Sequence, residues 1–231
     1  MSRSELGFRK GRASTRTLLI FGVAAGLLYV AADVLAGLLL DGYSFRDQHI
    51  SETGALGTST RTFVTVLMAI HGLLVGAFGT GVRRASGGSR TLRWVGNLLI
   101  SVAVVTVLGV IFAPMSMRGS APSLNGTMHV VYISISSLMI LVSIGLSAIA
   151  LKGGFRVYAW TSLIVMFAFG AWAGTFAGDI EAGNPTPWAG AIERASVYIY
   201  LVWLIVFAIS LMKRENSRQA KRDLGVVKEQ T

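Results

Sequence analysis

The sequence predicts an all-α, polytopic membrane protein: a bundle of six transmembrane helices with a short interfacial helix in the first outer loop. Three observations predict this fold. Six apolar stretches each have about the 20 residues that a helix needs to cross a bilayer core. Of the 231 residues, 53% are hydrophobic and only 14% are charged, a balance unfavourable for a water-soluble globule of this size. The basic residues fall almost entirely on one side of the six stretches.

The chain divides into a basic N-terminus, a six-helix domain and a charged tail. The N-terminus covers 1–16, the membrane domain 17–212 and the tail 213–231. The predicted spans within the domain are 17–40, 62–82, 92–114, 126–151, 157–178 and 194–212. The first span is too long to be the core of a cleavable signal peptide, so we expect it to be retained. The tail is rich in charge and poor in apolar residues, and we expect it to be disordered.

Glycines recur at four-residue spacing within several spans. They are Gly22 and Gly26, Gly72 and Gly76, and the series Gly170, Gly174 and Gly178. Small residues at this spacing let two membrane helices approach closely. We expect these glycines to pack helices within one chain, with one contact open to a homo-oligomer.

The charge distribution predicts the orientation of the chain. If both termini lie inside, only Arg46, Arg61, Arg118 and Arg194 remain outside. Cytoplasmic segments retain Lys and Arg during insertion, so both termini are expected in the cytoplasm, with a bacterial inner (plasma) membrane as the location. The net charge of +10 is explained by this topology, and no nucleic-acid partner is expected. The absence of cysteine excludes thiolate chemistry, and we predict no cofactor and no bound metal.

Ionisable residues that lie within or at the start of the spans include Asp33, His71 and His129. A charge in hydrocarbon costs several kcal/mol, so such residues generally face a protein interior or a hydrated cavity. For Asp33, a functional pocket and an interhelical hydrogen bond are equal alternatives. His71 is expected to be a neutral packing residue. His129 shares one helical face with Tyr132 and Ser136, so polar side chains lie next to it.

The first outer loop is the most distinctive stretch of the chain. Ser44 followed by Asp47 fits a capping box and Gly54 fits a helix stop, so we predict a short helix over 45–53. On that helix Gln48 and Glu52 would be neighbours at i and i+4. The simplest picture is a helix that lies in the interface beneath the outer headgroups.

Glu193 and Arg194 begin the sixth span. A glutamate suits a helix N-terminus, whereas an arginine there opposes the helix dipole and needs a carboxylate partner. Asp33, Asp47 and Glu52 are the candidates. We therefore predict a ligand-binding polar cluster in the outer-leaflet half, formed by Asp33, Tyr43, Gln48, Ser51, Glu52, His129, Glu193 and Arg194.

These residues resemble a known family. The resemblance rests on Tyr43, the run from Gln48 to Ala55, Phe112-Ala-Pro114 with His129 beyond it, and Glu193-Arg194 followed by Trp203. This pattern is similar to the family called domain of unknown function 998. The resemblance implies six transmembrane helices and an outer polar cluster, without an established reaction. The family often has an acidic residue shortly after the Phe-x-Pro, but here Arg118 lies in that loop, so a carboxylate-dependent role is not expected there.

Three functions follow as alternatives. The first is binding or transport of a lipid or small amphiphile whose headgroup enters the polar cluster. The second is a membrane hydrolase or transferase in which His129 or His49 activates Ser51 or a water. A metal held by His49, His129 and Glu52 is conceivable in that reading, although the spacing has no zinc signature. The third is a structural or assembly protein in which the cluster only joins helices.

Overall fold

Every regular element in the described part of the chain is helical. The computed structural model describes the backbone of residues 3–228 and the side chains of residues 15–220. The elements are α1 (Arg3–Leu39), the 3-10 helix η1 (Ile50–Gly54), α2 (Arg61–Ala85), α3 (Arg90–Phe112), α4 (Leu124–Ala150), α5 (Gly154–Gly174), α6 (Ala177–Ala182) and α7 (Ala189–Lys228). Six of these helices are long and apolar enough to cross a membrane, which confirms the predicted fold class.

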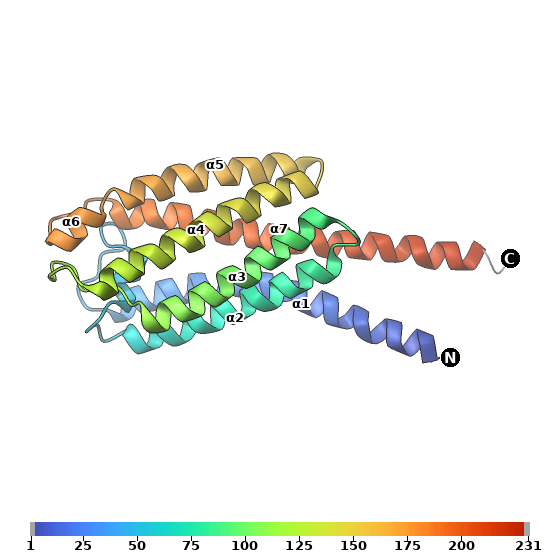
Figure 1. The fold of residues 1–231 in the computed structure, drawn as a ribbon, viewed down its shortest axis with the longest axis horizontal. Helices are drawn as coiled ribbons and strands as arrows, with labels where there is room; N and C mark the ends of the chain where they lie inside the picture. Colours follow the sequence, from blue (N-terminus) through green and yellow to red (C-terminus); the bar gives the residue numbers. More distant parts are fainter. Residues whose placement is uncertain (1–2, 229–231) are drawn as a thin grey trace.

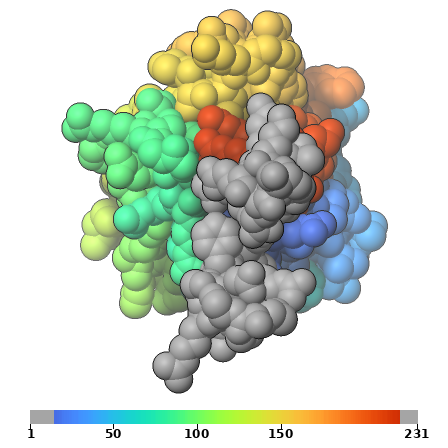
Figure 2. All heavy atoms as spheres, turned by 90° about the vertical axis from the view of Figure 1, so that its right-hand side faces the viewer, coloured from blue at the N-terminus to red at the C-terminus, as the bar shows by residue number. Residues whose placement is uncertain are grey.

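The six long helices form a closed ring. Each packs against two neighbours in the order α1, α2, α3, α4, α5, α7 and back to α1 (Figure 1). The two ends of the chain project from the same end of the bundle, which we call the terminus end, together with the α2–α3 and α4–α5 turns. Figure 2 views this end, with α5 at the top and α1 at the right. The opposite end, called the loop end, carries the first loop with η1, the α3–α4 loop and α6.

The terminus half of the ring is filled by apolar and aromatic side chains. The rings of Trp203 and Phe207 stack at 5.2 Å, and Phe78 meets Phe207 edge-on at 5.8 Å. The indole Nε1 of Trp203 donates to Ser147 Oγ at 3.2 Å, which satisfies the polar atom that burial would otherwise strand. This half of the ring is therefore a packed core.

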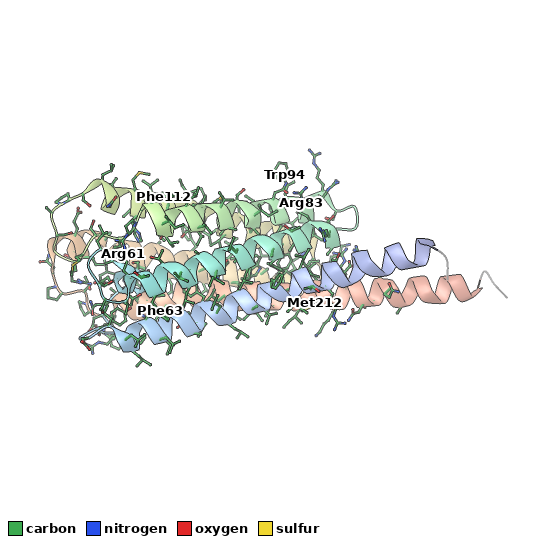
Figure 3. The ribbon with its side chains drawn as sticks, turned by 90° about the horizontal axis from the view of Figure 1, so that it is seen from below. Arg61, Phe63, Arg83, Trp94, Phe112 and Met212 are labelled. Carbon is green, nitrogen blue, oxygen red and sulfur yellow. The ribbon has the colours of Figure 1, made fainter. Side chains whose placement is uncertain are left out.

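Exposed tryptophans lie near both ends of the bundle, as expected for a protein that spans a bilayer. Trp94 and Trp160 lie towards the terminus end, and Trp172 and Trp188 towards the loop end. Figure 3 shows Arg83 and Trp94 at one end, and Arg61 and Phe112 towards the other. Tryptophan concentrates at the two membrane–water interfaces because its ring is apolar and its N–H is polar.

Most of the spaced glycines pack helices within the chain, as predicted. A Cβ on Gly22 would lie 2.8 Å from the Phe78 ring, and one on Gly72 would lie 2.8 Å from Val107. Gly26, Gly76 and Gly170 also meet neighbouring helices. The prediction is wrong for Gly174 and Gly178, where no heavy atom lies within 4 Å of the Cβ position. Spacing alone does not tell which face of a helix meets a neighbour.

The close approach of the α2 and α3 backbones gives a testable prediction. A Cβ on Gly79 of α2 would lie 2.8 Å from the carbonyl oxygen of Gly96 on α3. Because backbone atoms cannot move aside as a side chain can, we expect Gly79→Ala to cost about 1–3 kcal/mol of stability. Thermal denaturation in detergent measures this, with Gly174→Ala as the matched control in open space. Equal midpoints for the two variants would contradict the close packing of α2 and α3.

The charged tail is expected from the sequence to be frayed or disordered, and in the structure α7 continues through it as a helix to Lys228. Within this extension Arg218 donates to Glu215 at 3.0 Å and to the Ala85 carbonyl oxygen at 3.1 Å. The second bond satisfies a carbonyl at the C-terminus of α2, where such groups lack an intrahelical partner. The basic side chains expected at 3–12 and 221–228 lie outside the described side chains.

Candidate functional site

The first loop does not form the predicted helix over 45–53. Residues 45–47 form a turn, and η1 begins only at Ile50. Groups on α7 account for the difference: Arg194 Nη1 donates to the Phe45 carbonyl oxygen at 2.7 Å, and the Ala191 N–H donates to the Arg46 carbonyl oxygen at 3.0 Å. An α-helix through the loop would need these carbonyls for its own N–H groups. Tertiary contacts therefore override the local helix signal.

Two local parts of the prediction are confirmed. The Asp47 N–H donates to Ser44 Oγ at 3.2 Å, as a capping interaction requires. The Gln48 amide also reaches Glu52, with Nε2 donating to Oε2 at 3.3 Å.

The backbone of the first loop packs directly on α7, since a Cβ on Gly190 would collide with the Gln48 carbonyl oxygen. A glycine is needed there for the loop and the helix to approach.

Arg194 and Asp33 form a buried, bidentate ion pair between α7 and α1. Arg194 Nε lies 3.0 Å from Asp33 Oδ2, and Nη2 lies 2.8 Å from Oδ1. The Asp33 side chain is 0% exposed and that of Arg194 is 11% exposed. Tyr198, one turn after Arg194 on α7, donates its hydroxyl to Asp33 Oδ2 at 2.7 Å. Of the three carboxylates considered as partners for Arg194, the structure selects Asp33.

The remaining donors of Arg194 bind the first loop. Nη2 donates to Tyr43 Oη at 2.6 Å, and Nη1 reaches the carbonyl oxygens of Phe45, Gln48 and Gly190. The guanidinium also lies 4.9 Å from the centre of the Phe45 ring. Burial raises the pKa of Tyr43 well above its ordinary value, so this hydroxyl stays protonated. All five N–H groups of Arg194 thus point at protein acceptors, which makes it a link between α1, the first loop and α7.

A second bidentate pair joins Glu52 to Arg118. Arg118 Nη2 lies 2.7 Å from Glu52 Oε1 and Nε lies 2.9 Å from Oε2, and the Glu52 side chain is only 5% exposed. Arg118 also donates to the Asn184 carbonyl oxygen at 2.9 Å and to Thr186 Oγ1 at 3.0 Å. This one side chain therefore connects the first loop, the α3–α4 loop and the segment before α7.

The third pair, Arg46 with Asp47, lies at the surface of the loop end. The Arg46 side chain and the Trp188 N–H hold the pKa of Asp47 below its usual range by bonding to its charged form. Trp188 precedes α7 with a φ of 71°, a left-handed conformation that a bulky residue seldom adopts. The Asp47 Oδ1 accepts the Trp188 N–H at 3.0 Å and stabilises this turn.

Deeper in the loop half of the ring lies a group of titratable residues that we call the interior cluster. Its members are Glu193 and Tyr200 of α7, His49 of the first loop, Tyr29 of α1, and His129 and Tyr132 of α4. Glu193 Oε1 lies 3.9 Å from His49 Nδ1, and the rings of His129 and Tyr132 meet edge-on at 5.0 Å. The first loop and α7 thus meet at the Glu193 carboxylate, and His129 and Tyr132 of α4 lie at the same end of the bundle.

Several polar atoms in this region have no hydrogen-bond partner among the described residues. They are His49 Nε2, Tyr200 Oη and Ser136 Oγ, and Tyr200 and Ser136 are more than nine-tenths buried. His129 donates from Nδ1 to the Ala113 carbonyl oxygen at 3.1 Å, which leaves its Nε2 as a lone-pair acceptor. Buried polar groups are almost always bonded, so unpartnered ones call for an explanation.

Seven of the eight predicted site residues fall into three groups. Asp33, Tyr43 and Arg194 form one network, Gln48 and Glu52 belong to the Arg118 pair, and His129 and Glu193 belong to the interior cluster. Ser51 lies in η1 and forms no hydrogen bond with the other seven among the described side chains. His71 donates from Nδ1 to the Ala25 carbonyl oxygen at 3.0 Å and packs edge-on against Tyr29, in agreement with a packing role.

Arg118 and Tyr198, which bind residues of the predicted set, were not predicted, and neither was the buried Tyr200. Arg118 was assigned no partner, although an arginine in an outer segment near acidic residues is itself a signal for an ion pair. Tyr198 could have been found from its position four residues after Arg194, on the same face of α7. Tyr200 gave no local signal, because an aromatic residue in a span is usually a packing residue.

The geometry gives little support to the hypotheses of a hydrolase or of a metal site. Among the described side chains, Ser51 is not hydrogen-bonded to His49 or His129, so no nucleophile is paired with a base. No group of three or more potential ligand residues within residues 15–220 comes together in a way that could hold a metal ion. Glu52, one of the conceivable ligands, is engaged by Arg118.

Comparison with known proteins identifies the family. The model of the family described as "Protein of unknown function (DUF998)" matches residues 23–210, which is most of the chain. A search of curated proteins and a search of solved structures each found no match. The chain therefore belongs to the DUF998 family, in agreement with the resemblance carried by its loop motif and its Glu-Arg pair.

Proposed function

We propose that this DUF998 protein lies in a bacterial inner membrane with cytoplasmic termini and binds or transports a lipid or small amphiphile through its interior cluster. Membership of the family and six apolar helices establish an integral membrane protein of uncharacterised function. The ligand, its place of binding and the orientation are our proposal. The interior cluster, rather than Arg194, would contact the headgroup, because the donors of Arg194 are already bonded to protein.

The observation that carries the proposal is an uncovered flank of α4 beside the interior cluster. None of the residues 124–135 is buried, whereas the rest of α4 has a regularly buried face that begins at Ser136. Gly145, in that second part, packs against Leu163 and Trp160 of α5. Towards the loop end, by contrast, Gly174 of α5 has no heavy atom near its Cβ position. Helix α5 therefore does not cover the first half of α4.

This uncovered flank suits the two chemical parts of an amphiphile. Exposed apolar side chains follow one another along it: Leu124, Val130, Val131, Ile133 and Ile135. His129 and Tyr132 lie on the neighbouring face of the same helix and belong to the interior cluster. An acyl chain could pack on the apolar side chains from the bilayer while its headgroup reaches the polar groups within the ring. Ligand sites in bundles lie between helices and combine apolar walls with a few polar groups.

The orientation is supported by the charges at the two ends. Of the four arginines at the loop end, Arg46, Arg118 and Arg194 are each bonded to a carboxylate. Their positive charge is therefore neutralised, while the terminus end retains most of the Lys and Arg residues. Alkaline phosphatase, which is active only outside the cytoplasm, should be silent when fused after Arg84 and active after Gly183. The reverse pattern would refute the proposed orientation.

Native mass spectrometry and thermal shift with a lipid panel test the proposed binding. We expect an amphiphile to remain bound to the purified protein and to raise its denaturation midpoint. Tyr132→Phe removes one hydroxyl from the interior cluster and should weaken binding about fivefold, the value of one hydrogen bond. Tyr158→Phe, which makes the same change on α5 near the terminus end, is the control. Binding of no amphiphile, or an equal loss in both variants, would refute the proposal.

A further inference from the structure

We infer that the ligand of the interior cluster carries an ammonium group, which pairs with Glu193. This inference rests on the proposed function and names the chemical class of its ligand. It follows from the charges in the loop half of the ring and from the unbonded acceptors of Glu193 and His129. The charge of the ligand is inferred without using the apolar flank of α4 or the family membership.

The carboxylates in the loop half of the bundle differ in whether a cation neutralises them. Three carboxylates lie within the loop half of the bundle: Asp33, Glu52 and Glu193. Arg194 neutralises Asp33 and Arg118 neutralises Glu52, each through two hydrogen bonds. Glu193 has no Lys or Arg nitrogen within 4 Å among the described side chains. An ionised carboxylate in such a place is costly unless a cation accompanies it.

His49 is a poor partner for that carboxylate. Its Nδ1 lies 3.9 Å from Glu193 Oε1, which is too far for a hydrogen bond. Its Nε2 is buried and has no partner. A protonated imidazole has two N–H donors, and here one would lack an acceptor and the other would be too far from Glu193 for a hydrogen bond. His49 therefore forms no hydrogen bond with Glu193, and no Lys or Arg nitrogen lies within 4 Å of this carboxylate among the described side chains.

Glu193 and His129 also present acceptors that receive no hydrogen bond from the described residues. Glu193 accepts one hydrogen bond, from the Ile50 N–H, and its other oxygen has no hydrogen bond among the described residues. His129 presents a bare Nε2, because its Nδ1 donates to the Ala113 carbonyl oxygen. An ammonium has three N–H donors and no acceptor, so it complements this set. A phosphate or carboxylate has acceptors only and would be repelled by Glu193.

Glu193 is accessible to such a group. Its side chain is 21% exposed. The Asp33 and Glu52 side chains are only 0% and 5% exposed, and each is closed off by its arginine. The carboxylate that lacks a cation is therefore the one that a ligand can reach.

A matched series of dodecyl amphiphiles tests the inference on the purified full-length protein. The probes share one tail and differ only in the head: dodecylamine is cationic at pH 7, dodecanol is neutral and dodecanoate is anionic. Competition against a retained lipid, followed by native mass spectrometry, gives relative affinities. We expect dodecylamine to bind at least tenfold more tightly than dodecanol, and dodecanoate to bind most weakly. Equal affinities, or preference for dodecanoate, would overturn the ammonium inference.

A pair of variants assigns the effect to Glu193. Glu193→Gln should remove the preference for dodecylamine over dodecanol, whereas Glu181→Gln, the same change on the exposed helix α6, should preserve it. Preference retained in Glu193→Gln would overturn the assignment. If that variant fails to fold, the competition on the wild-type protein still decides the ligand class. Lysophosphatidylethanolamine and lysophosphatidylglycerol, compared in the same way, tell whether a lipid headgroup can supply the ammonium.

The outcomes separate this inference from the proposed function. Binding of amphiphiles with no dependence on head charge would leave the proposed function standing and overturn the ammonium inference. Binding of no amphiphile at all would overturn both. A dodecylamine preference that is lost only in Glu193→Gln would support both.

Discussion

Replacement of Arg194 by alanine is expected to destabilise the protein more than any other single change at the loop end. The substitution strands the Asp33 carboxylate, which is fully buried and would retain only the Tyr198 hydroxyl. Breaking a buried ion pair from one side costs about 3–5 kcal/mol because an unpaired charge remains. The first loop also loses the donors that hold its carbonyl oxygens at Phe45 and Gln48. We expect a denaturation midpoint in detergent lower by about 10 °C.

A double mutant separates the charge from the packing. Arg194→Met with Asp33→Asn removes both charges and should recover part of the stability lost in Arg194→Met alone, because no buried ion remains. Arg61→Ala is the control: this arginine lies at the same end of the bundle but forms no ion pair within residues 15–220. A loss in Arg61→Ala equal to that in Arg194→Ala would show that the effect comes from general surface charge.

The second large effect is expected for Arg118→Ala. Glu52 would lose both arginine hydrogen bonds while it remains buried, and the segment before α7 would lose its bonds at Asn184 and Thr186. Arg118 is partly exposed, so water can replace some of what is lost, and we expect a cost of about 2–3 kcal/mol. The change should be concentrated in the loops. Hydrogen–deuterium exchange should rise in residues 49–60 and 183–188 and stay unchanged in the terminus half of the bundle.

The conservative variant Arg118→Lys tests whether geometry matters in addition to charge. A lysine keeps the positive charge but cannot form the two parallel bonds that a guanidinium makes with a carboxylate. We expect Arg118→Lys to recover less than half of the exchange protection lost in Arg118→Ala. Complete protection in Arg118→Lys would show that only the charge of residue 118 is needed.

The two arginine pairs and the interior cluster play different parts. All five N–H groups of Arg194 and four of the five of Arg118 bond to protein acceptors, so the pairs hold α1, α7 and the loops in fixed positions. Glu193, only one residue before Arg194, is not bonded to that network and instead lies near His49 and the Ile50 N–H. Neighbouring residues on a helix differ in direction by about 100°, which allows one to brace the site while the other faces a ligand.

Much of the fold could be predicted because membrane insertion of each helix depends on the length, apolarity and flanking charges of its own segment. The length and apolarity of each span, and the side on which Lys and Arg collect, do not depend on which helices touch. The convergence of Asp33, Glu52, His129 and Arg194 at one end also follows, since hydrocarbon penalises such groups elsewhere. These inferences need no knowledge of the helix order around the ring.

Partner choice and loop conformation were decided only by the tertiary structure. Arg194 had three possible carboxylates in sequence, and the ring places α1 beside α7, which brings Asp33 to it and leaves Glu52 for Arg118. The helix signal over 45–53 was locally correct at Ser44 and Asp47, but donors on α7 took the carbonyls that the helix needed. Hydrogen bonds and ion pairs are short-range and directional, so the partner of each side chain depends on which helices become neighbours. The order of the six helices around the ring cannot be predicted from the periodicity of any single helix.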